Sequence, residues 1–143
     1  MGLFLFWKLP AAWFMGVGLR SCDQVRSVAS LPYRWRSQNP FQSLYFAAQC
    51  AAGEFATGML GTTHLQGKPP ISMLVTHIEA AFLKKAADTL LFTCEEGREV
   101  EAVIEKALAS GEGQTITMTA VGTLPDGTVA SRVSVTWSFK KKR

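Results

Sequence analysis

The sequence has few of the residues that build metal centres or disulfide frameworks. It contains three cysteines and two histidines in 143 residues. Cys22, Cys50 and Cys94 form no CxxC pair, and their odd number favours free thiols in a reducing, cytoplasmic compartment. His64 and His77 have no cysteine or carboxylate at the spacing of a zinc ligand set. We therefore expect neither a metal ion nor a cofactor.

The sequence also lacks a recognisable export signal or membrane span. The first residues, MGLFLFWKLPAAWFMGVGLR, have no basic segment before the apolar ones, and Lys8 and Pro10 interrupt the apolar run. Neither a secretory signal nor a spanning helix is expected from this pattern. Phe6 stands where N-myristoylation requires Ser or Thr. We expect residues 1–18 to form an N-terminal helix that covers the domain; peripheral membrane contact through its aromatic residues is the alternative.

Long charged runs and repeats are absent as well. Charged residues make up 18% of the chain and hydrophobic residues 48%, which is typical of one globular domain over residues 1–143. The net charge of +4 is concentrated in residues 140–143, which we interpret as a solvated basic tail. No aromatic residues are interleaved with a basic surface, so nucleic-acid binding is not expected.

Hydrophobic periodicity predicts an α+β fold. After the helix at 1–18, the predicted elements are an extended segment at 22–36, a helix at 39–61, strands at 71–86 and 88–94, a helix at 98–110, and strands at 116–123 and 129–139. Asn39 and Pro40 form a helix-start signal, and Gly61 a stop signal. The turn sequence at 124–127 predicts that the last two strands form an antiparallel hairpin. The 39–61 helix is apolar on nearly all sides, so the sheet is expected to curl around it.

One carboxylate, Glu54, lies within this apolar helix. Helical spacing places it on a stripe of small, weakly polar residues: Ser43, Ala47, Cys50, Ala51, Thr57, Gly58 and Gly61. A buried charge without a partner is costly, so Glu54 must be hydrogen-bonded, protonated or near water. Thr57, one turn further on, could bond it. Glu54 is then either paired at a subunit interface, or a carboxylate of raised pKa that acts as a base or nucleophile.

The segment NPFQSLYFAAQCAAGEFATG, residues 39–58, resembles the central helix of hotdog-fold acyl-CoA thioesterases, and most closely their DUF4442 branch. Asn39 matches the Asn of the family pattern and Glu54 matches its acid. Tyr45 stands at the usual His, Phe46 and Ala47 stand at the usual Gly-Gly, and Gln42 stands at a Gly. The segments FLKKA, residues 82–86, and VTWSF, residues 135–139, also resemble that branch. The resemblance covers about residues 10–140.

The resemblance implies a hydrolase of acyl-CoA or a similar thioester, with Glu54 as general base or nucleophile. Asn39 would orient water or the carbonyl, or only cap the helix. An N–H near Phe46 or Ala47 would stabilise the oxyanion, and Tyr45 would replace the missing His or abolish catalysis. Residues implied in substrate binding are Phe46, Ala47, Cys50, Thr57, Gly58, Lys84 and Lys85, the lysines contacting CoA phosphates. A homodimer or dimer of dimers with shared sites is implied too.

Two other functions and one other nucleophile fit parts of the pattern. A non-catalytic acyl or acyl-CoA binder is suggested by the loss of the His-Gly-Gly element. A dehydratase would need a His beside the acid, where Tyr45 stands, and His77 in a predicted strand is interpreted as structural. Cys50 shares the stripe with Glu54, but no His is placed in the sequence to activate its thiol.

Overall fold

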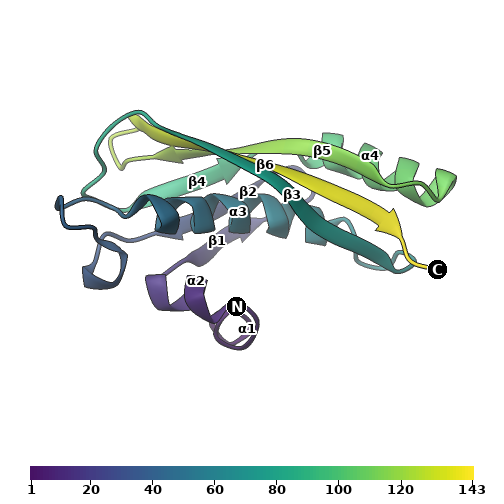
Figure 1. The fold of residues 1–143 in the computed structure, drawn as a ribbon, viewed down its shortest axis with the longest axis horizontal. Helices are drawn as coiled ribbons and strands as arrows, with labels where there is room; N and C mark the ends of the chain where they lie inside the picture. Colours follow the sequence, from purple (N-terminus) through teal and green to yellow (C-terminus); the bar gives the residue numbers. More distant parts are fainter.

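The computed structural model describes residues 1–143 and places a central helix, α3 (Phe46–Thr63), against one six-stranded antiparallel sheet. Figure 1 shows the strands bending around α3. The strand order is β1-β2-β4-β5-β6-β3, with bounds Gly18–Cys22, Ser27–Leu31, Leu90–Cys94, Gln114–Thr123, Val129–Lys141 and Ile71–Phe82, respectively. The predicted α+β architecture, a curved antiparallel sheet around an apolar helix, is confirmed. It is the hotdog arrangement that the resemblance implies.

Small residues allow α3 to lie close to the sheet. Ala48, Ala52 and Ala56 are fully buried, and Phe55 and Leu60 fill the space beside them. A Cβ atom on Gly53 would lie 2.5 Å from the Cβ of Val133 in β6, a separation that real side chains do not reach. The glycine is therefore needed for contact between helix and strand, and burial of the sheet-facing side of α3 contributes to the stability of the fold.

The predicted hairpin of β5 and β6 is confirmed, with Met118 opposite Val135. Both side chains are fully buried. The alternate positions carry hydroxyl groups that pair across the strands on the other face, including Thr119 to Ser134 at 2.9 Å. Helix α4 (Gly97–Ser110) contacts α3, β5 and β6 and buries Val100, Ile104 and Ala107. Its stop at Gly111, which has a φ of +71°, matches the sequence prediction.

The start of the central helix was predicted wrongly. The helix begins at Phe46 rather than at residue 39, and its N-cap residue is Tyr45. Asn39 instead holds the loop before the helix, because its Oδ1 accepts hydrogen bonds from the backbone N–H groups of Phe41 and Ser43 at 2.9 and 3.2 Å. The Asn side chain bonds nearby backbone N–H groups in local turns as well as in helix N-caps.

The end of the central helix was also predicted wrongly, since α3 continues past Gly61 to Thr63. A Cβ at Gly61 would lie 2.8 Å from the Cε atom of Met73. This glycine therefore serves a close side-chain contact and does not terminate the helix.

The N-terminal helix at 1–18 is in fact two helices, α1 (Gly2–Lys8) and α2 (Pro10–Met15). Pro10 disfavours helical dihedrals at the preceding residue, and Leu9 has φ −137° and ψ 62°. Gly16, with a φ of +89°, ends α2, and β1 begins at Gly18. Figure 1 shows both helices projecting from the rest of the molecule. None of the helices of the structure combines the length and the hydrophobicity of a membrane-spanning segment.

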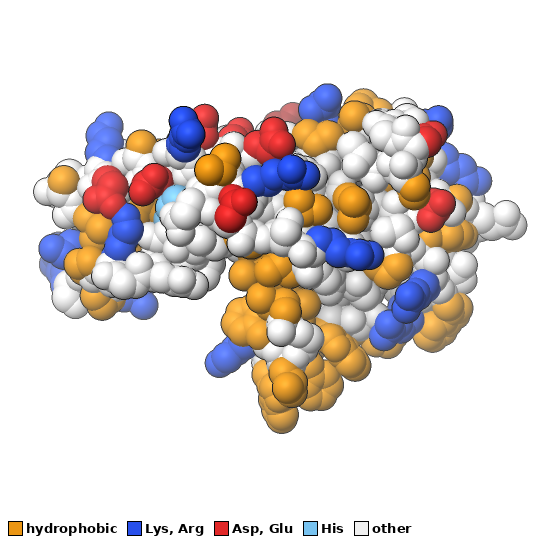
Figure 2. Space-filling view, turned by 180° about the vertical axis from the view of Figure 1, so that it is seen from behind, with side chains coloured by type: hydrophobic (Ala, Val, Ile, Leu, Met, Phe, Trp, Pro, Cys, Tyr) orange, Lys and Arg blue, Asp and Glu red, His pale blue; other side chains and the backbone are white.

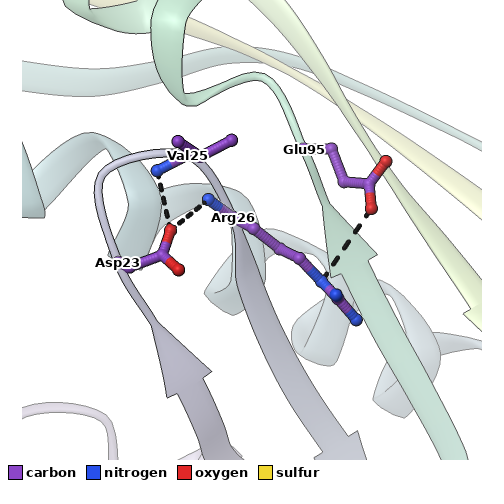
Figure 3. Close-up of polar contacts among 4 residues, drawn as sticks. All are labelled: Asp23, Val25, Arg26 and Glu95. Carbon is purple, nitrogen blue, oxygen red and sulfur yellow. Dashed lines mark hydrogen bonds and ion pairs between the residues drawn. The ribbon is translucent and has the colours of Figure 1, made fainter.

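The extended segment predicted at 22–36 is two paired strands, β1 and β2, followed by a short 3-10 helix, η1 (Trp35–Ser37). Asp23 makes the turn between the strands, accepting the N–H groups of Val25 and Arg26 at 2.8 Å each (Figure 3). These two bonds, Val25 first, lower the pKa of Asp23. Arg26 also pairs with Glu95 at 3.9 Å, which ties the turn to the end of β4.

Several strand boundaries after residue 70 differ from the prediction, including the start of β4 at Leu90 and of β5 at Gln114. β3 ends at Phe82 instead of residue 86. Residues 140–143 are not a free tail, because Lys140 and Lys141 belong to β6 and pair with Ser72 and Ile71 of β3. The two lysine side chains are exposed, but their backbone is part of the sheet. β3 is the last strand of the sheet, so its other edge has no partner within the chain.

Candidate functional site

The carboxylate of Glu54 lines a small cavity between α3, the N-terminal helices and the sheet. The cavity has a volume of about 190 Å³. Most of its lining is apolar: Phe4, Leu9, Phe55, Met59, Met73 and Trp137, with Gly58 and Thr62 beside Glu54. Glu54 is half-buried and is the only ionisable side chain in this lining. The arrangement can hold a short apolar group against a carboxylate.

No side chain neutralises this carboxylate. The two ion pairs of the structure are Arg26 with Glu95 and Lys68 with Glu105, and the Glu54 carboxylate has no hydrogen-bond partner within the chain. Desolvation by burial raises the pKa of Glu54 above its ordinary value. A raised pKa means a stronger base when ionised, which is the property expected of a group that takes a proton from water.

The prediction that Thr57 holds the Glu54 carboxylate is wrong. The Thr57 hydroxyl donates to the backbone carbonyl of Glu54 at 2.9 Å. It also accepts the indole N–H of Trp137 at 2.9 Å. Thr57 is fully buried. Its role in the cavity is therefore indirect, since it fixes the ring of Trp137, which forms one wall.

Gly58 brings that wall close to the helix. A Cβ at Gly58 would lie 3.1 Å from the Cζ2 atom of Trp137 and 3.8 Å from the Oε1 atom of Glu54. A larger residue there would press on the indole ring and fill space next to the carboxylate. Gly58 is thus the one residue of the predicted binding set that shares the cavity with Glu54.

A second pocket lies at the N-terminal end of α3, and we call it the Gln49 pocket. Its volume is about 480 Å³. The lining brings together four residues predicted for the site, Asn39, Phe46, Lys84 and Lys85, with Ser43, Leu44, Gln49, Phe82, Leu83 and Ala86. Lys84 and Lys85 are exposed. Of the predicted site residues, four line this pocket and two, Glu54 and Gly58, line the Glu54 cavity. The other four line neither: Tyr45, Ala47, Cys50 and Thr57.

The N-terminus of α3 beside this pocket has free backbone donors. The N–H groups of Phe46, Ala47 and Ala48 have no hydrogen-bond partner, and no side chain caps the helix. Such groups, together with the helix dipole, stabilise an anion or a polarised carbonyl oxygen. Tyr45 precedes them with its side chain exposed, and its ring contacts that of Phe46 edge-on with a centroid separation of 4.9 Å.

Part of the small-residue stripe lies on the outward face of α3, whereas Ser43, Thr57 and Gly61 of the same stripe are buried. Ala47, Cys50, Ala51, Glu54 and Gly58 are all half-buried, although they belong to the central helix. Burial raises the pKa of the Cys50 thiol, so the thiolate is disfavoured there. Neither histidine lines the Glu54 cavity. Nothing in the structure activates Cys50 as a nucleophile.

Comparison with known proteins places the chain in a family. Residues 4–139 match the model of the domain of unknown function DUF4442. The chain belongs to the DUF4442 family. A search of curated proteins found no match to this sequence.

Solved structures share the fold of this DUF4442 protein at low identity. Protein OLEI01261 of unknown function, from Chlorobaculum tepidum TLS, has a TM-score of 0.84 at 15% identity, covering 99% of this chain and 92% of that one. PA5026 from Pseudomonas aeruginosa, described as a probable thioesterase, has a TM-score of 0.79 at 11% identity, covering 99% of this chain and 94% of that one. Thioesterase HI1161 from Haemophilus influenzae has a TM-score of 0.69 at 13% identity, covering 97% of this chain and 88% of that one. At these identities the similarity shows the hotdog fold.

Sequence reasoning missed Gln49 in this DUF4442 chain. The side chain is buried, and its Nε2 atom donates to the carbonyl of Leu44 at 3.1 Å. Its Oε1 atom is buried with no hydrogen-bond partner. Buried polar atoms are nearly always satisfied, so this oxygen is an acceptor available to a donor in the pocket. The signal was present, since Gln49 is, apart from Glu54, the only long polar side chain between Phe46 and Thr57.

Proposed function

We propose that the protein hydrolyses acyl thioesters, acyl-CoA or a similar carrier thioester, with Glu54 as the reacting carboxylate. The observation that carries the proposal is the state of Glu54: a half-buried carboxylate without a cation partner, of raised pKa, in an apolar cavity. As general base, it would take a proton from water while the water attacks the thioester carbonyl. As nucleophile, it would attack the carbonyl and break the C–S bond, so that the carrier leaves as a thiolate and an acyl anhydride forms. Water would then open the anhydride to the free acid and the Glu54 carboxylate, and its proton would go to the thiolate.

The oxyanion donors in this proposal are the free N–H groups at Phe46 and Ala47. Removal of one such donor in other enzymes costs about 3 kcal/mol of transition-state stabilisation. Lys84 and Lys85, which line the Gln49 pocket, would bind the phosphates of a carrier. Gln49 Oε1 would accept an amide N–H of the carrier arm. Asn39 is committed to the loop through its Oδ1, so we propose that it positions the helix start.

Within one chain, the Glu54 carboxylate and the N–H groups at the start of α3 lie too far apart to reach the same thioester carbonyl. From Phe46 to Glu54 the α-helix axis rises about 12 Å, whereas a general base and an oxyanion donor must both reach one reacting centre. Two copies of α3 that pack antiparallel about a two-fold axis near Cys50 would bring Glu54 of one subunit to Phe46 of the other. Cys50 is the midpoint between the two residues, and the small residues of the stripe permit close packing of the helices.

The surface around β3 fits such a homodimer. The edge of β3 is unpaired over twelve residues, and Ile78 and Phe82 are 44% and 46% exposed. A long apolar edge strand is a site of strand pairing between chains. Cross-linking with a short bismaleimide tests the arrangement. We expect a covalent dimer that survives Cys22→Ser and is lost in Cys50→Ser; an equally abundant dimer in Cys50→Ser would contradict the two-fold axis proposed here.

Activity is tested by thiol release from short, long and aromatic acyl-CoAs. We expect turnover by the wild type, with kcat/KM at least ~100-fold lower for Glu54→Gln. Glu101→Gln, an exposed glutamate on α4, is the matched control and should leave kcat/KM unchanged. Because the base acts in its ionised form, kcat/KM should fall as pH drops through the pKa of Glu54. If Glu54→Gln leaves turnover unchanged, the protein is a thioesterase but Glu54 is not its reacting carboxylate.

A non-catalytic acyl-binding protein is the second candidate function. It is favoured by the lining of the Glu54 cavity, which contains no second acid or base, and by the exposed position of Tyr45 at the usual His. No turnover on any acyl-CoA, together with acyl ligand retained through purification, would establish this function. Glu54 would then anchor the ligand.

A further inference from the structure

The two N-terminal helices expose a contiguous apolar surface. We call it the N-terminal patch and define it by Leu3, Phe4, Phe6, Trp7, Trp13 and Phe14, which are 40–76% exposed. Figure 2 shows hydrophobic side chains gathered on the projection that these helices form. Single exposed apolar residues are ordinary, but a continuous patch with several aromatic rings marks an interaction surface.

The patch is held in a fixed shape. Leu5 and Ala12 are buried in the core and anchor α1 and α2 to the body of the protein. The ring of Phe6 contacts Trp7 and Trp13 edge-on, with centroid separations of 5.2 and 4.9 Å. The aromatic rings therefore stand outward from a packed base, and their exposure is not that of a loose chain end.

Basic residues surround the patch. Lys8 ends α1. Arg20, Arg34 and Arg36 line a pocket of about 530 Å³ at the foot of the helices, beside Trp13, and no acidic side chain lines that pocket. None of these four cations is in an ion pair. The first 22 residues of the sequence contain no Asp or Glu. Unpaired positive charge thus lies next to exposed aromatic rings.

From this combination we infer that the N-terminal patch docks the protein onto a membrane surface that contains anionic lipid. Aromatic and aliphatic side chains insert at the boundary between headgroups and acyl chains, as amphipathic surface helices do. The basic residues then lie at the level of the lipid phosphates, and the pocket of Arg20, Arg34 and Arg36 is large enough for a headgroup. Trp rings also favour this interface, because they are amphipathic.

A second copy of the chain fits the patch less well. A two-fold contact brings the same surface of both subunits together. It would set Lys8 and the three arginines of one subunit against those of the other, and the pocket that the arginines line contains no acidic side chain. Like charges at an interface weaken association. An anionic lipid surface instead complements this charge.

The patch also adjoins the Glu54 cavity. Phe4 and Leu9 of the N-terminal helices form part of the cavity lining. A docked molecule would therefore hold the cavity next to the acyl-chain layer. Docking itself does not depend on catalysis, so the inference stands or falls separately from the proposed hydrolysis.

Vesicle co-sedimentation tests the inference. We expect the full chain to bind vesicles of equal parts phosphatidylcholine and phosphatidylglycerol, to bind phosphatidylcholine alone far more weakly, and to be released as salt is raised. The double variant Leu3→Ser/Trp7→Ser should bind at least ~10-fold more weakly, because it removes inserted apolar area. Each of Arg20→Gln and Arg34→Gln should weaken binding about fivefold. Both apolar side chains point into solvent, so an unchanged circular dichroism melt verifies the fold.

The matched control is Arg98→Gln/Lys106→Gln, which removes two exposed cations from α4 and should leave vesicle binding unchanged. Equal loss in this control would show that only net charge matters and would overturn the docking site. Absence of binding to either vesicle, or binding that Leu3→Ser/Trp7→Ser does not weaken, would also overturn it. A dimer in light scattering that this variant abolishes, without vesicle binding, would assign the patch to contact between copies.

Discussion

The hydrogen bond between Thr57 and Trp137 gives a prediction whose size follows from the structure. Thr57 is fully buried and Trp137 is 7% exposed, and the indole N–H donates to the hydroxyl at 2.9 Å. Thr57→Val keeps the shape of the side chain but removes the acceptor. The indole N–H then stays buried without a partner, which costs about 1–3 kcal/mol of unfolding free energy.

Thermal and urea unfolding measure this loss. For a domain of this length, about 1 kcal/mol corresponds to roughly 3–4 °C in Tm, so Thr57→Val should unfold at least about 3 °C below the wild type. Thr62→Val is the matched control. Its hydroxyl donates to the carbonyl of Gly58 at 2.8 Å in the same helix, but it is exposed, and its loss should stay within about 0.5 kcal/mol.

A double-mutant cycle isolates the cause. In a Trp137→Phe background the indole N–H is absent, so adding Thr57→Val should cost much less than it does in the wild type. An equal cost in both backgrounds would refute the reasoning, because the loss would then arise from the bond to the carbonyl of Glu54 or from packing. In the wild-type background we also expect Thr57→Val to lower kcat/KM, since the cavity wall loses its anchor.

Two further predictions concern charge and close packing in α3. Burial raises the pKa of Glu54 in the folded protein above its unfolded value. Proton binding by Glu54 therefore stabilises the folded state fully below the unfolded pKa, and this stabilisation is lost as pH rises through the folded pKa. Glu54→Gln should therefore be more stable than the wild type at higher pH, with a gap that narrows toward acid in a urea series. Gly53→Ala should lower Tm, because its Cβ would lie 2.5 Å from Val133, at a cost of about 1–3 kcal/mol or more. Gly113→Ala, which meets no atom within 4 Å, should leave Tm nearly unchanged.

Much of the fold was predictable where one periodicity extended over a whole element. The alternation in 129–139 and the helical spacing in 98–110 both persisted over enough residues to specify β6 and α4. The apolar character of the central helix, on all its sides, was enough to place it inside the sheet. These predictions succeeded because burial of apolar side chains is the dominant favourable term in folding, and the spacing of apolar residues in the sequence shows which side of each element is buried.

Predictions failed at residues whose type is compatible with more than one local structure. Asn39 and Ser43 carry the chemistry of a helix cap, but here the same hydrogen bonds close a loop that ends before Tyr45. Gly61 carries the chemistry of a helix stop, but it accommodates Met73. Local sequence does not distinguish these uses, because the choice depends on which distant residue is present in the fold.

The candidate site was only half predictable for a similar reason. Glu54 stood out from the sequence, since a lone acid in an apolar helix is rare in itself. Its surroundings did not, because Trp137, Phe4 and Met73 come from three distant segments. The separation between Glu54 and the helix start follows from helix geometry once Phe46 is known to begin α3. With the start predicted at residue 39, that relation was hidden.

The energetic cost of Glu54 is itself an argument that the residue has a function. A carboxylate that is half-buried, desolvated and without a cation or hydrogen-bond partner lowers the stability of the native state at neutral pH. Neither the packing of α3 on the sheet nor the bond between Thr57 and Trp137 uses its side chain. Ala would have a higher helix propensity at this position, and neither Ala nor Gln would place a charge there. A functional role explains why a residue that costs stability is present, and a substrate, an attacking water or a second subunit would supply the partner that Glu54 lacks within the chain.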